Sequence, residues 1–133
     1  MFERLLADPD EVVDLLAEVA RSSDAPVLMR ERALGVLGGA VTHTARSRCL
    51  DVVDVAMAIA TDSEAPELRR RAVSVMEAVV ATFGAIRGHA PIPRARAAGW
   101  LASLDKMRTA ASAAEAIRLL ALRREIEREV AAP

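Results

Sequence analysis

The chain has 133 residues, of which 53% are hydrophobic and 28% charged, and its formal net charge is −1. This length suits one domain with one core and is too short for two domains of ordinary size. The near-neutral charge excludes a bulk electrostatic attraction to nucleic acid or to an anionic membrane. The chain has no Asn, Gln or Tyr and only 2% aromatic residues, so helix formers dominate and strand formers are scarce.

Apolar spacing and helix-breaking residues predict six helices. An acid followed by proline at Asp8-Pro9 starts the first helix. Ser22-Ser23-Asp24 ends that helix and caps the second, which begins at Pro26. Gly38 and Gly39 either end the second helix early or let another helix approach it closely.

The other four helices follow at similar intervals. Residues 42–48 are expected to form a loop, and helices then cover about 49–61 and 66–83. The longest break, 84–93, contains two Gly and two Pro, and helices follow from Pro93 and from about Ser112. The expected core consists of the apolar residues at helical spacing, namely Val12, Val13, Leu16, Val19, Ala20, Leu34, Leu37, Val41, Val52, Val55, Ala56, Ile59, Leu68, Ala72, Val75, Met76, Val79, Val80, Ala97, Trp100, Leu101, Leu104, Met107, Ile117, Leu120, Ala121 and Ile126.

The second pair of helices repeats the first at a period of about 40 residues. Thirteen identities occur over about thirty positions, with one residue dropped from the second copy. This period fits stacked helix pairs, because one pair cannot bury its apolar stripes without a neighbour. The matches are Val12-Val13-Asp14 with Val52-Val53-Asp54, Ala20 with Ala60, Ser23 with Ser63, Ala25-Pro26 with Ala65-Pro66, Leu28 with Leu68, Arg30 with Arg70, and then Arg32, Ala33, Val36 and Val41 with Arg71, Ala72, Val75 and Val80.

Two segments resemble the start of the second helix of a HEAT repeat. In that helix an acid is followed by proline, an aliphatic-arginine step, alanine and leucine. The segments are DAPVLMRERALGVL from Asp24 and EAPELRRRAVSV from Glu64, and the resemblance covers 8–83. It implies an all-α fold, a short right-handed α-solenoid of about three antiparallel helix pairs of the HEAT or armadillo type. We therefore expect one domain over 1–133, with repeats at about 8–41 and 48–83 and a degenerate repeat or C-terminal cap at 92–131.

The acid–arginine pairs in these segments are predicted to be structural rather than catalytic. Asp24 and Glu64 are expected to cap helix N-termini. The HEAT resemblance implies that Arg30 and Arg70 bridge to acids of an adjacent repeat.

One edge of the stack is predicted to carry a basic rim, and the opposite edge is expected to be acidic. The only two histidines and several arginines lie in the loops of the basic edge, where they could dock an acidic peptide, a phosphate or a nucleic-acid backbone. Solvated loops are the plainer interpretation. The candidate partner-binding residues are His43, Arg46, Arg48, Arg87, His89, Arg94 and Arg96. The histidines and Cys49 lack the tight spacing of a zinc site, so we predict no metal.

We expect a non-catalytic scaffold or adaptor for protein–protein interaction, without a cofactor. The sequence has no phosphate-binding glycine loop, paired-cysteine motif, nucleophile elbow or histidine–acid metal box. Acids near the N-terminus, where a signal peptide would be basic, and the lack of a long apolar run predict a cytoplasmic protein. The expected partner is another protein with an acidic or amphipathic helical segment, and self-association is a further option. Two alternatives stay open: a nucleic-acid-binding helical-repeat protein that uses its arginine-bearing loops, and a small helical enzyme or ligand-binding protein with a groove site.

Overall fold

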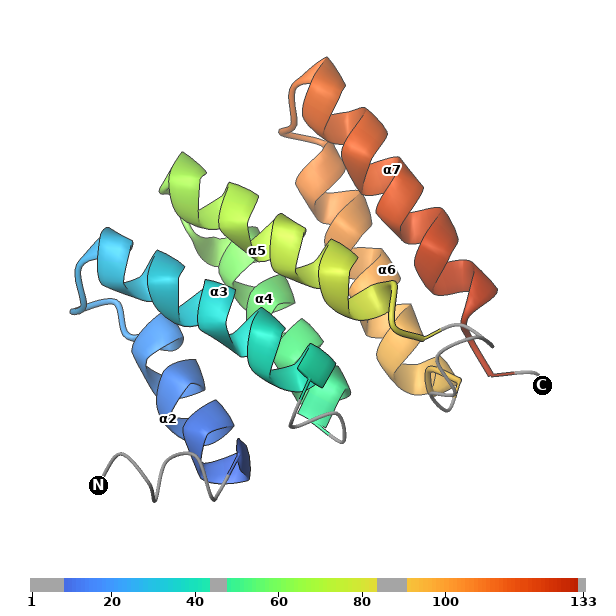
Figure 1. Ribbon diagram of the computed structural model, residues 1–133. Coiled ribbons are helices and arrows are strands. Elements are labelled where there is room, and N and C mark those ends of the chain that lie inside the picture. The colour runs from blue at the N-terminus through green and yellow to red at the C-terminus, as the bar shows by residue number, and fades with distance from the viewer. Residues whose placement is uncertain (1–8, 44–47, 84–90, 132–133) are drawn as a thin grey trace.

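The described chain is all-helical. The computed structural model describes residues 9–43, 48–83 and 91–131, and these ranges contain no strand. Their six helices (Figure 1) are α2 (Pro9–Arg21), α3 (Val27–His43), α4 (Cys49–Asp62), α5 (Pro66–Val80), α6 (Arg94–Arg108) and α7 (Ala113–Arg128). The six predicted helices are confirmed to within a few residues. The predicted loop at 42–48 begins too early, because Thr42 and His43 belong to α3.

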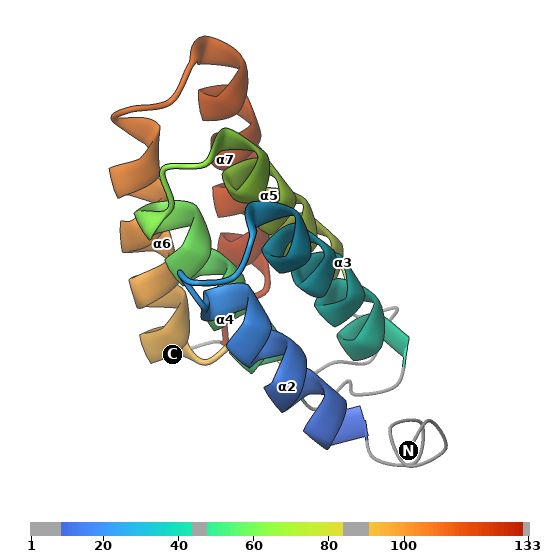
Figure 2. The same cartoon turned by 90° about the vertical axis from the view of Figure 1, so that its left-hand side faces the viewer.

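The helices lie in two layers, which Figure 2 shows from the side. One layer holds α2, α4 and α6, and the other holds α3, α5 and α7. Each helix of the first layer packs against the helix that follows it in sequence, and neighbours within a layer also touch. The pair α4–α5 therefore lies beside the pair α2–α3, and segments about 40 residues apart in sequence are neighbours in space.

Local sequence sets the start of several helices. Pro66 occupies the first turn of α5, where a missing N–H costs nothing. Ser112 caps α7: its Oγ accepts a hydrogen bond from the backbone N–H of Glu115 at 3.2 Å. Ser and Glu at this spacing are typical of a capping box, which satisfies two of the amides that a helix leaves unpaired at its N-terminus.

Gly38 lets α3 and α5 approach closely. A Cβ built on Gly38 would lie 3.5 Å from Cγ1 of Val75 on α5. One built on Gly35 would lie 3.9 Å from Nη1 of Arg71. Of the two roles considered for the glycines, close approach is the one observed at Gly38, since α3 continues through Gly39 to His43.

A single core runs through all six helices. Most of the predicted core residues in α2–α6 are buried, including Leu34, Leu37, Val75, Met76 and Trp100. The residues Val12, Leu16, Val19, Leu101 and Met107 are only half-buried.

The predicted core face of α7 is confirmed only at Ile126. Ile117 is 72% exposed, Ala121 is exposed and Leu120 is half-buried. The buried residues are Leu119, Leu122 and Ile126. Helix α7 has two apolar stripes at helical spacing, and packing against α5 and α6 buries the stripe that follows Arg118.

Helices α6 and α7 are tied together at one end. The N–H of Ile92 donates to the carbonyl of Glu129 at 2.7 Å, and the N–H of Ala131 donates to the carbonyl of Ile92 at 2.9 Å. The Ile92 side chain is fully buried. This bridge fixes the end of the pair that lies far from the α6–α7 turn.

Candidate binding groove

A groove of about 600 Å³ opens between α5 and α7, on the side of the α4–α5 and α6–α7 turns. It lies at the end of the α6–α7 pair opposite the Ile92 bridge. The residues around it come from four helices and two turns: Ala60, Thr61, Asp62, Ser63, Glu64, Pro66, Arg69, Arg70, Val73, Lys106, Met107, Thr109, Ala110, Ala111, Glu115, Arg118 and Leu119.

The groove exists because α7 packs less closely against α5 than α5 packs against α3. Toward α5, α3 presents Gly35 and Gly38, which have no side chains. Toward α7, α5 presents Ser74 and Glu77, whose side chains bind Arg118. Larger side chains keep the two backbones further apart, so the last helix pair stands away from its neighbour.

Arg118 connects the two sides of the groove, α5 and α7. Its Nη2 donates to Oε1 of Glu77 at 2.6 Å and to Oγ of Ser74 at 2.8 Å, and its Nε donates to Oε2 of Glu77 at 2.9 Å. The hydrogen bond with Glu77 raises the pKa of Arg118. A bidentate arginine–carboxylate pair has a fixed geometry. This contact therefore fixes the spacing of α5 and α7, and the charge of Arg118 is not free to bind a ligand.

Two cations of the groove are available to a ligand. Arg70 on α5 and Lys106 on α6 are exposed, and neither forms an ion pair or side-chain hydrogen bond within the described part of the chain. The guanidinium group of Arg69 is already hydrogen-bonded, since its Nη1 donates to the carbonyl of Ser63 at 3.0 Å. The lining also includes the half-buried, apolar Val73 and Met107. The groove therefore combines apolar contact area with two unpaired positive charges, and its lining also carries the exposed acids Asp62, Glu64 and Glu115.

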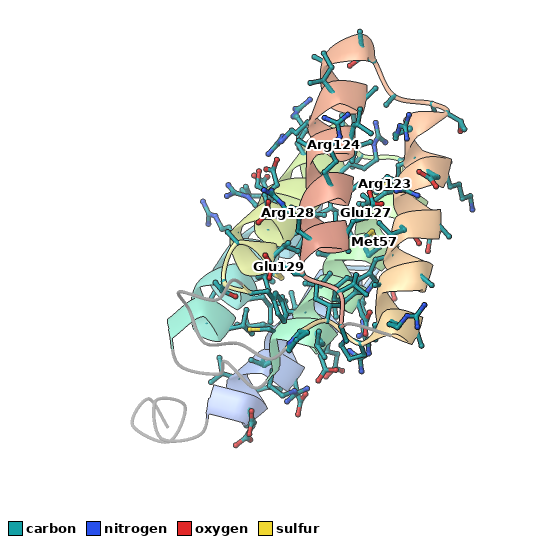
Figure 3. The ribbon with its side chains drawn as sticks, turned by 90° about the vertical axis from the view of Figure 1, so that its right-hand side faces the viewer. Met57, Arg123, Arg124, Glu127, Arg128 and Glu129 are labelled. Carbon is teal, nitrogen blue, oxygen red and sulfur yellow. The ribbon has the colours of Figure 1, made fainter. Side chains whose placement is uncertain are left out.

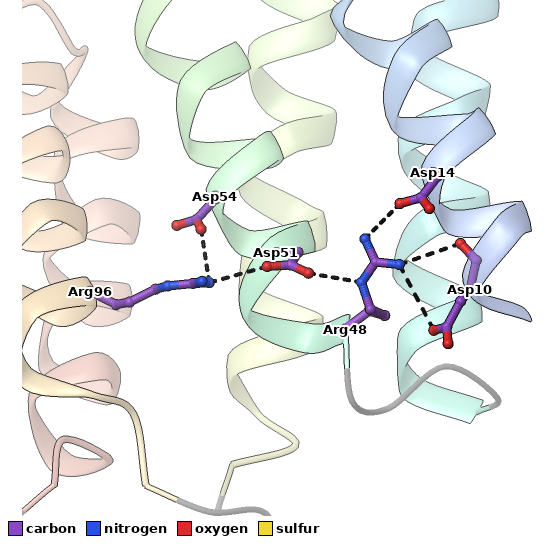
Figure 4. Close-up of polar contacts among 6 residues, drawn as sticks. All are labelled: Asp10, Asp14, Arg48, Asp51, Asp54 and Arg96. Carbon is purple, nitrogen blue, oxygen red and sulfur yellow. Dashed lines mark hydrogen bonds and ion pairs between the residues drawn. The ribbon is translucent and has the colours of Figure 1, made fainter.

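Two arginines of the predicted basic rim instead bind acids of this chain (Figure 4). Arg48, at the start of α4, pairs with Asp14 at 2.6 Å and with Asp51 at 2.8 Å. Arg96, on α6, pairs with Asp54 at 2.9 Å and with Asp51 at 3.4 Å. The hydrogen bonds to Asp14 and Asp51 raise the pKa of Arg48. These pairs join α2 to α4 and α4 to α6.

The other predicted rim residues are not brought into one site. Arg94 is exposed at the start of α6 and has no ion pair among the described residues. His43 is the last residue of α3, and its side chain lies outside the described part. Arg46, Arg87 and His89 lie in the ranges 44–47 and 84–90, which are also outside it.

The predicted roles of the structural pairs are not observed, because within the described ranges neither Arg30 nor Arg70 pairs with an acid of an adjacent repeat. The Nε of Arg30 donates to the carbonyl of Ala20 at 2.9 Å, and Arg69, rather than Arg70, makes the comparable contact in the next pair. Glu64 is not the N-cap residue of α5; that residue is Ala65, and no side chain caps it. Asp24 is exposed in the turn before α3 and forms no ion pair within the described ranges.

Different arginines join neighbouring pairs in the second layer. Arg71 on α5 pairs with Glu31 on α3 at 3.2 Å, as Arg118 on α7 pairs with Glu77 on α5. Sequence reasoning overlooked both, although each arginine is followed directly by a buried apolar residue, Ala72 or Leu119.

The outer side of α7 is a charged surface (Figure 3). Arg123 pairs with Glu127 at 2.8 Å and with Asp105 on α6 at 3.0 Å, and Arg128 pairs with Glu125. Arg124 is exposed and unpaired within the described part. These contacts fit a solvated helix face.

Asp51→Asn removes the carboxylate that pairs with Arg48 and Arg96, and it is expected to lower the free energy of unfolding by about 1 kcal/mol near neutral pH. The loss is small because these ion pairs are half exposed to water. The hydrogen bond from Arg48 holds the pKa of Asp51 below its usual value of 3.8. The carboxylate therefore stabilises the fold above that value, and its contribution is lost as pH falls through the lowered pKa. Urea denaturation between about pH 7 and about pH 3 should show the difference from wild type shrinking toward acid. The exposed acid Asp62, changed to Asn, is the control; a difference for Asp51→Asn that does not vary with pH would contradict the expectation.

In comparisons with protein-family models, with curated proteins and with solved structures, no significant match to this chain was found. None of the helices within the described ranges is long and apolar enough to cross a membrane. Among the described residues, no three His, Cys, Asp or Glu side chains are placed so that they could hold a metal ion.

Proposed function

We propose that this chain is a non-catalytic protein-interaction module of the cytoplasm. In this proposal it is a short right-handed α-solenoid of HEAT-like helix pairs. Its groove between α5 and α7 binds an amphipathic helical segment of another protein. The observation that carries the proposal is the groove itself, which sets exposed Arg70 and Lys106 beside the apolar Val73 and Met107.

Three observations support the solenoid arrangement. The sequence of the first helix pair recurs in the second. The two pairs lie side by side, with the first helix of each pair in one layer and the second helix in the other. Arginines Arg71 and Arg118 each reach back from one pair to an acid of the pair before it. In both contacts an arginine of one pair meets an acid of the pair before it, as in a stack of similar units, although the acids stand at different positions, since Glu77 corresponds to Gly38 of α3.

The lining of the groove favours a partner segment with apolar and acidic residues on one face. An apolar side chain of the partner would pack on Val73 and Met107 and be removed from water. Carboxylates beside it would meet Arg70 and Lys106, which orients the segment. A volume of about 600 Å³ accommodates a few side chains of such a helix.

Nucleic-acid binding through the loop arginines has less support. Arg48 and Arg96, two of the residues proposed for it, are held by Asp14, Asp51 and Asp54. A phosphate would have to displace these carboxylates.

A peptide selection tests the proposed groove. Acidic amphipathic helices selected on the full chain from a displayed library should bind with an affinity that falls about tenfold or more in Arg70→Glu or Lys106→Glu, which corresponds to 1.4 kcal/mol or more. The matched control is Arg21→Glu, which makes the same charge change at an exposed arginine of α2, a helix that packs against α3 and α4 and does not line the groove. Failure to select any binder, or equal losses in the groove variants and the control, would contradict the proposal.

A further inference from the structure

One side of α3 exposes apolar residues that a soluble helix normally buries. Met29 and Val36 are 53% and 54% exposed, and Arg32 beside them is exposed and forms no ion pair within the described part of the chain. Ala33 lies on the same stripe and is buried. We call Met29, Arg32, Ala33 and Val36 the outer stripe of α3.

The same pattern occurs 39 residues later on α5, where it is buried in a helix interface. Leu68, Ala72 and Val75 stand at the positions of Met29, Ala33 and Val36, and all three are buried. Val75 packs over Gly38 of α3. Arg71, at the position of Arg32, pairs with Glu31 of α3.

A third copy of the pattern lies on α7. Arg118, Leu119 and Leu122 have the spacing of Arg71, Ala72 and Val75. Both leucines are buried, and Arg118 binds Glu77 and Ser74 of α5. In both observed interfaces the arginine thus meets a carboxylate of the preceding helix, and the apolar residues that follow it are buried.

The helix that receives α5 also has a distinctive surface. Glu31 supplies the carboxylate, and Gly35 and Gly38 leave room for the arginine and the valine. These three residues follow the spacing i, i+4, i+7, which places them on one face of a helix.

We propose that the outer stripe of α3 is a second docking surface, and that it binds a helix of another protein that presents a carboxylate and two small residues at that spacing. Arg32 pairs with the carboxylate, and Val36 and Met29 pack over the small residues. This inference rests on the proposed stacking of helix pairs and not on the groove. With both surfaces occupied, the chain bridges two proteins.

A second copy of this chain fits the outer stripe poorly. The last described helix is α7, and its positions that correspond to Glu31, Gly35 and Gly38 are Ile117, Ala121 and Arg124. Head-to-tail stacking would bring Arg124 of one copy against Arg32 of the next without a carboxylate between them. Like charges at such a contact are unfavourable, which favours a different protein as the occupant.

The probe for a test is a stapled, alanine-based helix that carries Glu, Gly and Gly with the spacing of Glu31, Gly35 and Gly38. Titrated into the full chain, it should shift the methyl resonances of Met29 and Val36 in NMR spectra. Arg32→Glu should weaken its binding about tenfold. A second probe with Arg in place of Glu should regain that affinity on the Arg32→Glu variant, because the ion pair is restored with the charges exchanged.

Arg70→Glu is the control, and it should leave the affinity of the first probe unchanged. The proposal is overturned if the probe shifts no α3 methyl at saturation, if it shifts Met107 instead, or if the two probes bind wild type equally. It is also overturned if light scattering shows self-association that Val36→Asp abolishes, since the occupant is then a second copy. Because the groove test uses Arg70 and Lys106 while this test uses Arg32, failure of one proposal is distinguishable from failure of the other.

Discussion

Replacing Trp100 with alanine should lower the free energy of unfolding by about 4 kcal/mol. Trp100 is the only tryptophan, it is buried, and it packs on the side of α6 that faces α4. Its Nε1–H also donates to Oδ1 of Asp54 at 2.6 Å. The substitution leaves a large cavity and removes one partner of the half-exposed Asp54 carboxylate, which keeps its ion pair with Arg96. Urea denaturation followed by circular dichroism measures the loss, since the variant has no tryptophan fluorescence.

Two milder variants separate packing from hydrogen bonding at this position. Trp100→Phe keeps a ring in the core and loses the hydrogen bond, and Asp54→Asn keeps an acceptor for the indole while removing the pair with Arg96. Each should cost about 1–2 kcal/mol. If Trp100→Ala were no worse than Asp54→Asn, the indole would not be a core residue.

Leu34→Ala should cost about 3 kcal/mol, because Leu34 is fully buried where α3 meets the core. Leu28→Ala on the same helix is the matched control: Leu28 is 57% exposed, and its truncation should change stability by less than about 0.5 kcal/mol. The chemical change is identical in the two variants, so the difference measured by urea denaturation reports burial alone. Equal losses would contradict the orientation of α3.

Much of the helical architecture could be predicted from the sequence, because residues close to each helix start determine where the helix begins. Prolines at Pro9 and Pro66 and the cap at Ser112 lie at or next to helix starts and need no distant partner to act. The sequence left two roles open for Gly38, an early end of the helix or the close approach of another helix. Only the position of Val75 on α5 decides in favour of the second.

Features that depend on two helices at once were not predictable in the same way. The two apolar stripes of α7 are equivalent by spacing, and the contact of Arg118 with Glu77 accompanies burial of Leu119 rather than Ile117. The groove was overlooked because it arises from the difference between Gly35 and Gly38 on α3 and the larger residues that α5 turns toward α7.

The arginines of the two helix pairs were matched incorrectly because the sequence alignment of α5 with α3 was wrong by one residue. The alignment that matches Arg30 with Arg70 needs a one-residue deletion in the second copy, and that deletion falls inside the second helix of the pair. A helix has a continuous phase, so residues of α3 and α5 correspond at an offset of 39 throughout, which matches Arg30 with Arg69 and Arg32 with Arg71. Arg69, like Arg30, donates to a backbone carbonyl that precedes its own helix, whereas Arg71 pairs with Glu31 and Arg32 has no pair within the described ranges.

The predicted basic rim illustrates a different difficulty. Arg48 and Arg96 lie near one another in the stack, but the acids of α2 and α4 at Asp14, Asp51 and Asp54 meet them there. Charge counted along the sequence does not show which arginines are paired. The unpaired groove cations, Arg70 and Lys106, lie on the edge that was expected to be acidic, where the exposed acids Asp62 and Glu64 also lie.

The stacking of successive helix pairs, on which both proposed surfaces depend, is tested most directly by one NMR measurement. In a nuclear Overhauser spectrum of protein labelled at its valine methyl groups, we expect a cross-peak between a Val75 methyl and the Hα protons of Gly38, because a Cβ on Gly38 would lie 3.5 Å from Cγ1 of Val75. Assigned resonances for both residues without that cross-peak would contradict the contact of α5 with α3, and with it the repeated interface from which the partner of α3 was inferred.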